Sequence, residues 1–204
     1  MLPTAFGDLV TKRALHDAGF RISHLSRPAH GFSPSRFGAR LLNPIYTAVE
    51  GRYLAERLVM SPGQSTGALR ELVRRVRDNR LVSITVHSAG RRTDSVPFFN
   101  GTIRLANGAP ALAQRTGAAL LPVYAARTAP GVFVTTVEPP LSVPPGITPA
   151  DGVRHRLIQC AALMESYVAR WPDQFRGWDL NAKDPEQRNE NHESTRVLKA
   201  RRGD

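Results

Sequence analysis

Hydrophobic residues recur at helical spacing in several parts of the chain. One set falls at positions i, i+3, i+4 and i+7 and predicts an amphipathic helix with arginines on another face: Leu69, Leu72, Val73 and Val76. The same spacing predicts three more helices, over residues 6–19, 107–116 and 151–170. Gly19 and Gly117 are expected to end the first two of these, since glycine is common just after a helix.

Between these helices, short apolar runs predict strands over residues 21–26, 81–86, 119–125 and 132–138. Helices that alternate with short strands predict an α/β fold, with a mostly parallel central sheet and helices packed on both faces. A turn at Pro130 and Gly131 is expected to separate the last two strands.

The region before residue 61 is less regular. Residues 29–44 are interpreted as a long loop that contains a short helix over residues 35–42. Residues 45–60 fit either one helix or a helix followed by a strand.

Composition places the chain among globular proteins. Its 204 residues favour a single domain, and its 41% hydrophobic and 22% charged residues are typical of folded proteins. No apolar run approaches the roughly 18 residues of a membrane-spanning helix, and residues 1–10 do not resemble a signal peptide. The single cysteine, Cys160, is expected to be a buried, inert thiol.

The net charge of the chain indicates which kinds of partner it would bind. The formal net charge is +11, and all but three of the 28 basic residues are arginines. Such a field favours anionic partners, namely phospholipid surfaces, phosphorylated glycolipids, coenzyme A or nucleic acid. Residues 183–204 have mixed charge and almost no apolar content, which predicts a disordered tail after a domain of residues 1–182.

A series of motifs follows in a fixed order along the chain. They are V-P-F-F-N-G at residues 96–101, N-G-A-P-A-L-A at 107–113, R-T-G-A-A-L-L-P-V at 115–123, Arg127, E-P-P-L at 138–141 and W-P-D-Q-F-R-G-W at 171–178. This order resembles the bacterial lysophospholipid acyltransferase family of the lipid A (lauroyl/myristoyl) and phosphatidylinositol-mannoside type. The resemblance extends from about residue 5 to residue 178.

The resemblance implies a glycerolipid acyltransferase-like fold and transfer of a fatty acyl group. The donor would be acyl-CoA or acyl-carrier protein, and the acceptor a membrane glycolipid or lysophospholipid at the cytoplasmic face of the plasma membrane. No cofactor and no metal are implied. Arg27, Arg92 and Arg127 are candidates for binding phosphate, because guanidinium groups suit such ligands. Phe98 and Phe99 are interpreted as either lipid contacts or core aromatics.

The catalytic motif of that family, H-x-x-x-x-D/E, is where this chain departs from the pattern. In the family, the histidine removes the proton of the acceptor hydroxyl and the carboxylate orients the imidazole. Here the two positions hold Ala5 and Val10. Asp8, inside the motif, and His87, where relatives often have an aspartate after a strand, are the remaining weak catalytic candidates. His87 is alternatively interpreted as a polar histidine of a loop or strand end.

Other functions stay open at this point. Loss of both catalytic positions fits an inactive homologue that binds lipid or a partner, and a start truncated ahead of the motif would also remove the histidine. The charge alone suggests a nucleic-acid-binding module, although the arginines are scattered and no stacking pattern accompanies them. The remaining histidines, at positions 16, 24, 30, 155 and 192, are interpreted as surface or packing residues.

Overall fold

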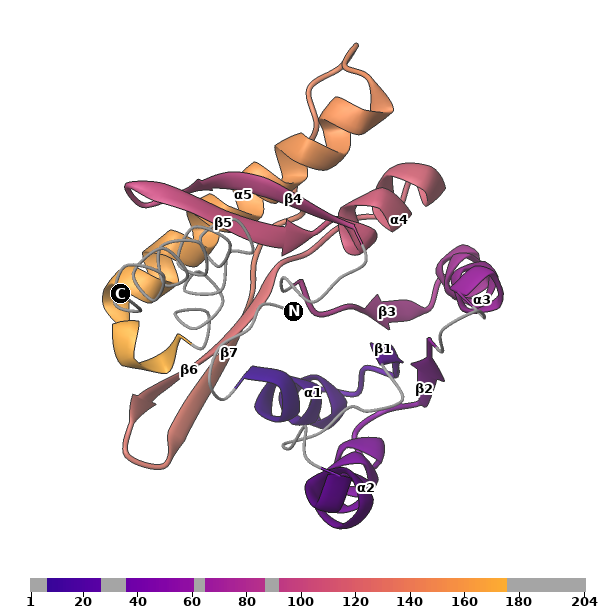
Figure 1. The fold of residues 1–204 in the computed structure, drawn as a ribbon, viewed down its shortest axis with the longest axis vertical. Coiled ribbons are helices and arrows are strands. Elements are labelled where there is room, and N and C mark those ends of the chain that lie inside the picture. Colours follow the sequence, from indigo (N-terminus) through magenta and orange to yellow (C-terminus); the bar gives the residue numbers. More distant parts are fainter. Residues whose placement is uncertain (1–6, 27–35, 61–64, 87–91, 176–204) are drawn as a thin grey trace, which may run out of the picture.

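A computed structural model describes residues 7–26, 36–60, 65–86 and 92–175 of the chain. The helices in these residues are α1 (Gly7–Asp17), α2 (Arg36–Gly51), α3 (Ser65–Arg77), α4 (Gly108–Thr116) and α5 (Pro149–Arg170). The strands are β1 (Ile22–Ser26), β2 (Glu56–Val59), β3 (Leu81–Ser83), β4 (Thr93–Phe98), β5 (Gly101–Ala106), β6 (Val123–Ala129) and β7 (Val132–Val137). A 3-10 turn, η1 (Pro172–Gln174), follows α5 (Figure 1).

A three-stranded parallel sheet forms one part of the fold. β1 lies between β2 and β3 and is parallel to both. Side chains alternate along a strand, so Ser23 and His24 of β1 face opposite sides of this sheet. Figure 1 shows α1 and α2 on one side of the sheet and α3 on the other.

The remaining strands form two antiparallel hairpins, β4–β5 and β6–β7. The prediction of an α/β fold is therefore confirmed, but parallel pairing in the described residues is confined to β1, β2 and β3. The reason is the length of the connections. Only Phe99 and Asn100 link β4 to β5, and only Pro130 and Gly131 link β6 to β7, whereas a parallel neighbour needs a long crossover.

The main apolar core lies between α5 and the two hairpins. α5 packs along β4, and the buried core side chains include Phe98, Leu105, Tyr124 and Leu157. The Tyr124 ring stacks on Tyr167 with ring centroids 4.0 Å apart. Cys160 is buried in this core as predicted, and desolvation raises the pKa of its thiol to about 11, which leaves little reactive thiolate at neutral pH.

Several predicted elements are found close to their expected places. α1, α3, α4 and α5 all fall on predicted helices, and Gly19 and Gly117 take the left-handed conformation after α1 and α4, with φ of 87° and 73°. β3 is shorter than predicted and ends at Ser83. β6 begins at Val123, later than predicted, and neither β4 nor β5 was predicted.

The interpretation of residues 29–44 as a loop with a short helix is wrong for the part that the structure describes. α2 is one continuous helix that passes through Pro44 and ends at Gly51, before β2. A proline inside a helix removes one backbone hydrogen bond. The predicted tail, residues 183–204, lies outside the described residues.

Candidate functional site

A cluster of polar side chains is buried between α1, α2 and the parallel sheet. Lys12 of α1, His24 of β1, Glu50 of α2 and Ser83 of β3 form this cluster, which we call the Lys12 cluster. Lys12 and Glu50 are both 0% exposed and form a short ion pair. Lys12 Nζ lies 3.1 Å from His24 Nε2, and His24 Nδ1 lies 2.8 Å from Ser83 Oγ.

The chemistry of Lys12 determines the protonation of His24. An ammonium group can donate hydrogen bonds but cannot accept them, so His24 Nε2 accepts the hydrogen bond from Lys12. A neutral imidazole then carries its proton on Nδ1, which donates to Ser83 Oγ. His24 is 1% exposed, and both of its ring nitrogens are engaged. It therefore cannot activate Ser83 as a nucleophile, and we assign this cluster a structural role.

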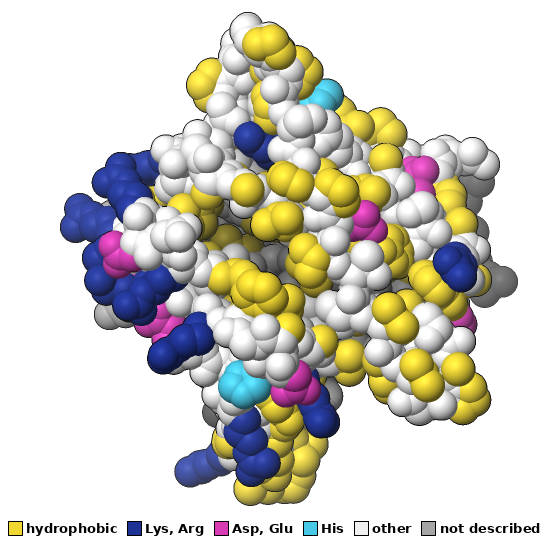
Figure 2. All heavy atoms as spheres, turned by 180° about the vertical axis from the view of Figure 1, so that it is seen from behind, with side chains coloured by type: hydrophobic (Ala, Val, Ile, Leu, Met, Phe, Trp, Pro, Cys, Tyr) yellow, Lys and Arg dark blue, Asp and Glu magenta, His cyan; other side chains and the backbone are white. Residues whose placement is uncertain are grey.

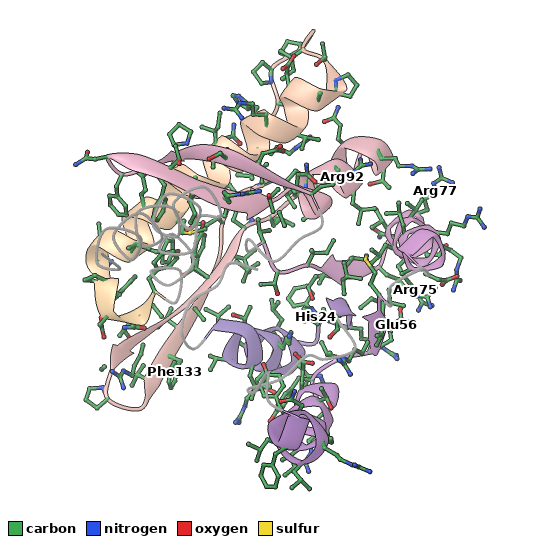
Figure 3. All side chains as sticks on the ribbon, viewed as in Figure 1. His24, Glu56, Arg75, Arg77, Arg92 and Phe133 are labelled. Carbon is green, nitrogen blue, oxygen red and sulfur yellow. The ribbon has the colours of Figure 1, made fainter. Side chains whose placement is uncertain are left out.

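A second polar network occupies the other side of the same sheet. Arg75 of α3 binds Glu56 of β2 through Nη2 at 2.8 Å and through a shorter bond from Nε, and Ser23 Oγ donates to Glu56 Oε1 at 2.6 Å. Arg75 also contacts Glu71. The hydrogen bonds from Arg75 and Ser23 lower the pKa of Glu56 from its usual 4.5 to about 2. Figure 3 shows Glu56 and Arg75 side by side, with His24 nearby on β1.

The edge where the parallel strands end is the best candidate for a ligand site. β1, β2 and β3 end there at Ser26, Val59 and Ser83, and we call this the carboxyl edge. In open parallel sheets, ligands bind beyond the carboxyl ends of the strands, where the loops meet. The chain continues from this edge directly into the sequence that contains Arg27 after β1 and His87 after β3.

The start of α1 points to the same edge. A short turn links α1 to β1, so the helix and the strand run in opposite directions. Both are about 16 Å long by their residue counts, and Lys12, near the middle of α1, contacts His24, in the middle of β1. Gly7 therefore lies toward the carboxyl edge. Val10, which the motif resemblance aligns with the family's acid position, is a half-buried residue of this first part of α1.

The catalytic candidates are only partly within the described residues. Ala5, Arg27 and His87 lie outside them, and of Asp8 the structure describes the backbone alone, as the second residue of α1. Lys12 and Glu50 were not among the predicted site residues. The one sequence signal for this cluster was the presence of serine and histidine in β1. A strand with a neighbour on each side is expected to be apolar, so polar residues there indicate buried polar contacts.

The two described arginine candidates are far apart. Arg92 precedes β4, is exposed, and accepts a hydrogen bond at its backbone oxygen from Asn107 N at 3.2 Å. Arg127 pairs with Phe133 across the β6–β7 hairpin, and its backbone N–H and C=O both bond the side-chain amide of Gln174. Figure 3 shows Phe133 and Arg92 on separate parts of the molecule, so these arginines do not form one phosphate site together.

The two phenylalanines of the V-P-F-F motif have different environments. Phe98 is 4% exposed and contacts Phe175 in the core, with ring centroids 5.7 Å apart. Phe99 is 48% exposed at the hairpin turn, where it has a positive φ of 49°. Its N–H donates to Glu165 Oε1 at 2.6 Å, which holds the turn against α5.

The described residues contain no group of three or more His, Cys, Asp or Glu side chains placed to hold a metal ion. Among the helices of the described ranges, none has the length and apolar character needed to cross a bilayer.

Replacing Lys12 by methionine tests whether the Lys12 cluster stabilises the fold. Lys12→Met leaves Glu50 charged and buried, which is expected to lower the free energy of unfolding by about 3–5 kcal/mol. The matched control is Arg13→Met, because the neighbouring Arg13 and its partner Asp17 are exposed and are expected to contribute at most about 0.5 kcal/mol. Urea unfolding measures both, and equal losses in the two variants would contradict the structural role.

Glu56 is expected to make stability depend on pH. Its pKa is lowered in the folded protein, so its contribution is present above pH 4.5 and is lost as the pH falls toward 2. Glu56→Gln should lower the free energy of unfolding by about 1–2 kcal/mol at pH 7, and the difference from wild type should shrink in acid. Asp17→Asn, at an exposed ion pair, serves as the control. A deficit that stays constant between pH 7 and pH 3 would show that charge on Glu56 is not responsible.

Comparison with known proteins agrees with the resemblance seen in the motifs. A family model for bacterial lipid A biosynthesis acyltransferases matches residues 17–176. The matched range includes the sheet and both hairpins and begins after Ala5 and Val10, the two residues that the motif resemblance aligns with the catalytic pair. No curated protein matches the chain. Because the family match spans well over half of the 204 residues, the chain belongs to the bacterial lipid A biosynthesis acyltransferase family.

Proposed function

We propose that this protein transfers a fatty acyl group to a membrane glycolipid or lysophospholipid, with acyl-CoA or acyl-carrier protein as donor. The observation that carries the proposal is the family match over residues 17–176. We also propose that the protein works at the cytoplasmic face of the plasma membrane as a peripheral protein. Its net charge of +11 supports this placement, since that face is anionic.

The arrangement around the carboxyl edge supports acyl transfer. The start of α1 and the ends of β1 and β3 converge there, and in the sequence Arg27 comes directly after β1 and His87 comes four residues after β3. The resemblance implies a glycerolipid acyltransferase-like core with a parallel sheet between helices, and β1, β2 and β3 form a parallel sheet of this kind. Figure 2 shows a hollow near the middle of one face, bordered by hydrophobic side chains, which suits an acyl chain.

The reaction needs a base for the acceptor hydroxyl. As this proton is removed, the oxygen attacks the thioester carbonyl, an O–C bond forms, the C–S bond breaks, and the departing sulfur takes up the proton as a thiol. Among the described histidines, His24 is engaged at both nitrogens, His16 lies at the opposite end of α1, and His155 lies on α5. We propose His87 as the base, because it follows β3 in the sequence at the place where the resemblance puts an aspartate in many relatives.

A second candidate function is a non-catalytic lipid-binding member of the family. Two observations favour it: the acid position of the motif is the apolar Val10 on α1, and His24 is too deeply buried and bonded to replace the missing histidine. In this case the fold would still bind an acyl donor or a lipid, and no transfer would follow.

Acyl transfer by three forms of the protein distinguishes these functions. Radiolabelled acyl-CoA and acyl-carrier protein are offered, with a panel of detergent-dispersed bacterial lipids, to wild type, His87→Ala, and the Ala5→His, Val10→Glu double variant. The first function predicts wild-type turnover that falls about 10²–10⁴-fold in His87→Ala, the usual contribution of a general base.

Other patterns have equally definite meanings. Turnover that appears only in the double variant would establish the second function, a retained framework without its catalytic pair. Wild-type turnover that His87→Ala leaves unchanged would overturn the role of His87. Silence from all three forms would overturn acyl transfer for this chain.

A further inference from the structure

Helix α2 is inverted relative to an ordinary surface helix. Its residues Phe37, Leu41 and Ile45 are 71%, 52% and 63% exposed and follow one another at i, i+4 spacing, so they form one stripe. On the inward side, Asn43 and Glu50 are only 4% and 0% exposed. A surface helix normally buries its apolar stripe and exposes its polar one.

The inversion follows from contacts on the inner side of α2. Glu50 pairs with Lys12, which in turn contacts His24, so this side of the helix is tied to α1 and to the middle of β1. If α2 were rotated to turn its apolar stripe inward, the stripe would face the polar Lys12 cluster. The ion pair between Lys12 and Glu50 would then be broken. The polar interior therefore holds Phe37, Leu41 and Ile45 outward.

The surroundings of the stripe are basic. Glu50 is the one acidic residue of α2, and it is buried. Arg40 is exposed on the same helix, and Arg52, also exposed, follows its end. Figure 2 shows hydrophobic and basic side chains together on the projection at the lower edge of the molecule, where α2 lies.

We propose that the Phe37–Leu41–Ile45 stripe of α2 is a docking surface for an anionic phospholipid bilayer. The stripe lies on a projecting helix rather than in a groove, and it combines apolar side chains with flanking arginines. A helix of this kind lies in the membrane interface, with its apolar side among the acyl chains and its cations at the headgroups. This proposal rests on the proposed function, which explains why the protein would bind a bilayer. It adds which surface of the protein makes the contact.

Vesicle sedimentation tests the docking surface with the full chain. Wild type is expected to bind vesicles of phosphatidylethanolamine and phosphatidylglycerol, and to bind phosphatidylcholine vesicles more weakly. Replacing Phe37, Leu41 and Ile45 together by serine is expected to reduce the partition coefficient at least about 30-fold, because three side chains no longer insert.

A matched control separates this site from general loss of hydrophobicity. Leu69, Ile147 and Ile158 are each 37–38% exposed on other parts of the chain, and their triple replacement by serine is expected to leave binding within about threefold of wild type. Circular dichroism and the urea midpoint check that both triple variants fold. Equal loss of binding in the two variants would overturn the proposal.

A second measurement reports the position of the helix directly. In the Phe37→Trp variant, brominated acyl chains should quench fluorescence more than in Leu69→Trp, because the tryptophan at position 37 lies among the acyl chains. Both variants keep the native tryptophans, so the difference reports the introduced residue. Equal quenching in the two variants would overturn the proposal. It would also be overturned if the wild type were an oligomer and the α2 triple variant a monomer that still binds vesicles. The acyl-transfer assay uses detergent-dispersed lipids, so failure of vesicle docking is distinguishable from failure of the proposed function.

Discussion

The buried ion pair between Lys12 and Glu50 joins two helices to the central strand of the parallel sheet. Both side chains are fully excluded from solvent, and Lys12 also contacts His24, whose other nitrogen bonds Ser83. Charges in such surroundings are tolerated only when each has its partner, because desolvation is costly. The orientations of α1 and α2 against the sheet are therefore linked, and neither can change without breaking the pair.

This constraint connects the interior with the two functional surfaces. On one side, it fixes α1 with its start toward the carboxyl edge, where the resemblance implies that the family's catalytic motif lies. On the other side, it fixes α2 with Phe37, Leu41 and Ile45 outward. The same buried pair thus orients both the start of α1 at the carboxyl edge and the stripe of α2 that we propose binds lipid.

Much of the secondary structure was predictable because it depends on local signals. Gly117 ends α4, and Pro130 with Gly131 turns the chain between β6 and β7, as the sequence indicates. The Lys12 cluster was not predictable, because Lys12 and Glu50 are 38 residues apart and no periodicity reports a buried charge pair. Pro44 was interpreted as the end of a loop because proline usually interrupts a helix, whereas α2 passes through it to Gly51.

The imidazole of His24 offers the most direct test of the central claim, that a charged Lys12 is buried against this ring and organises both helices. Nitrogen-15 NMR of the folded protein at neutral pH distinguishes the two neutral tautomers of histidine. The account predicts that His24 carries its proton on Nδ1, with Nε2 unprotonated and accepting from Lys12. A proton on Nε2 would contradict it, because an ammonium group could not then donate to that nitrogen.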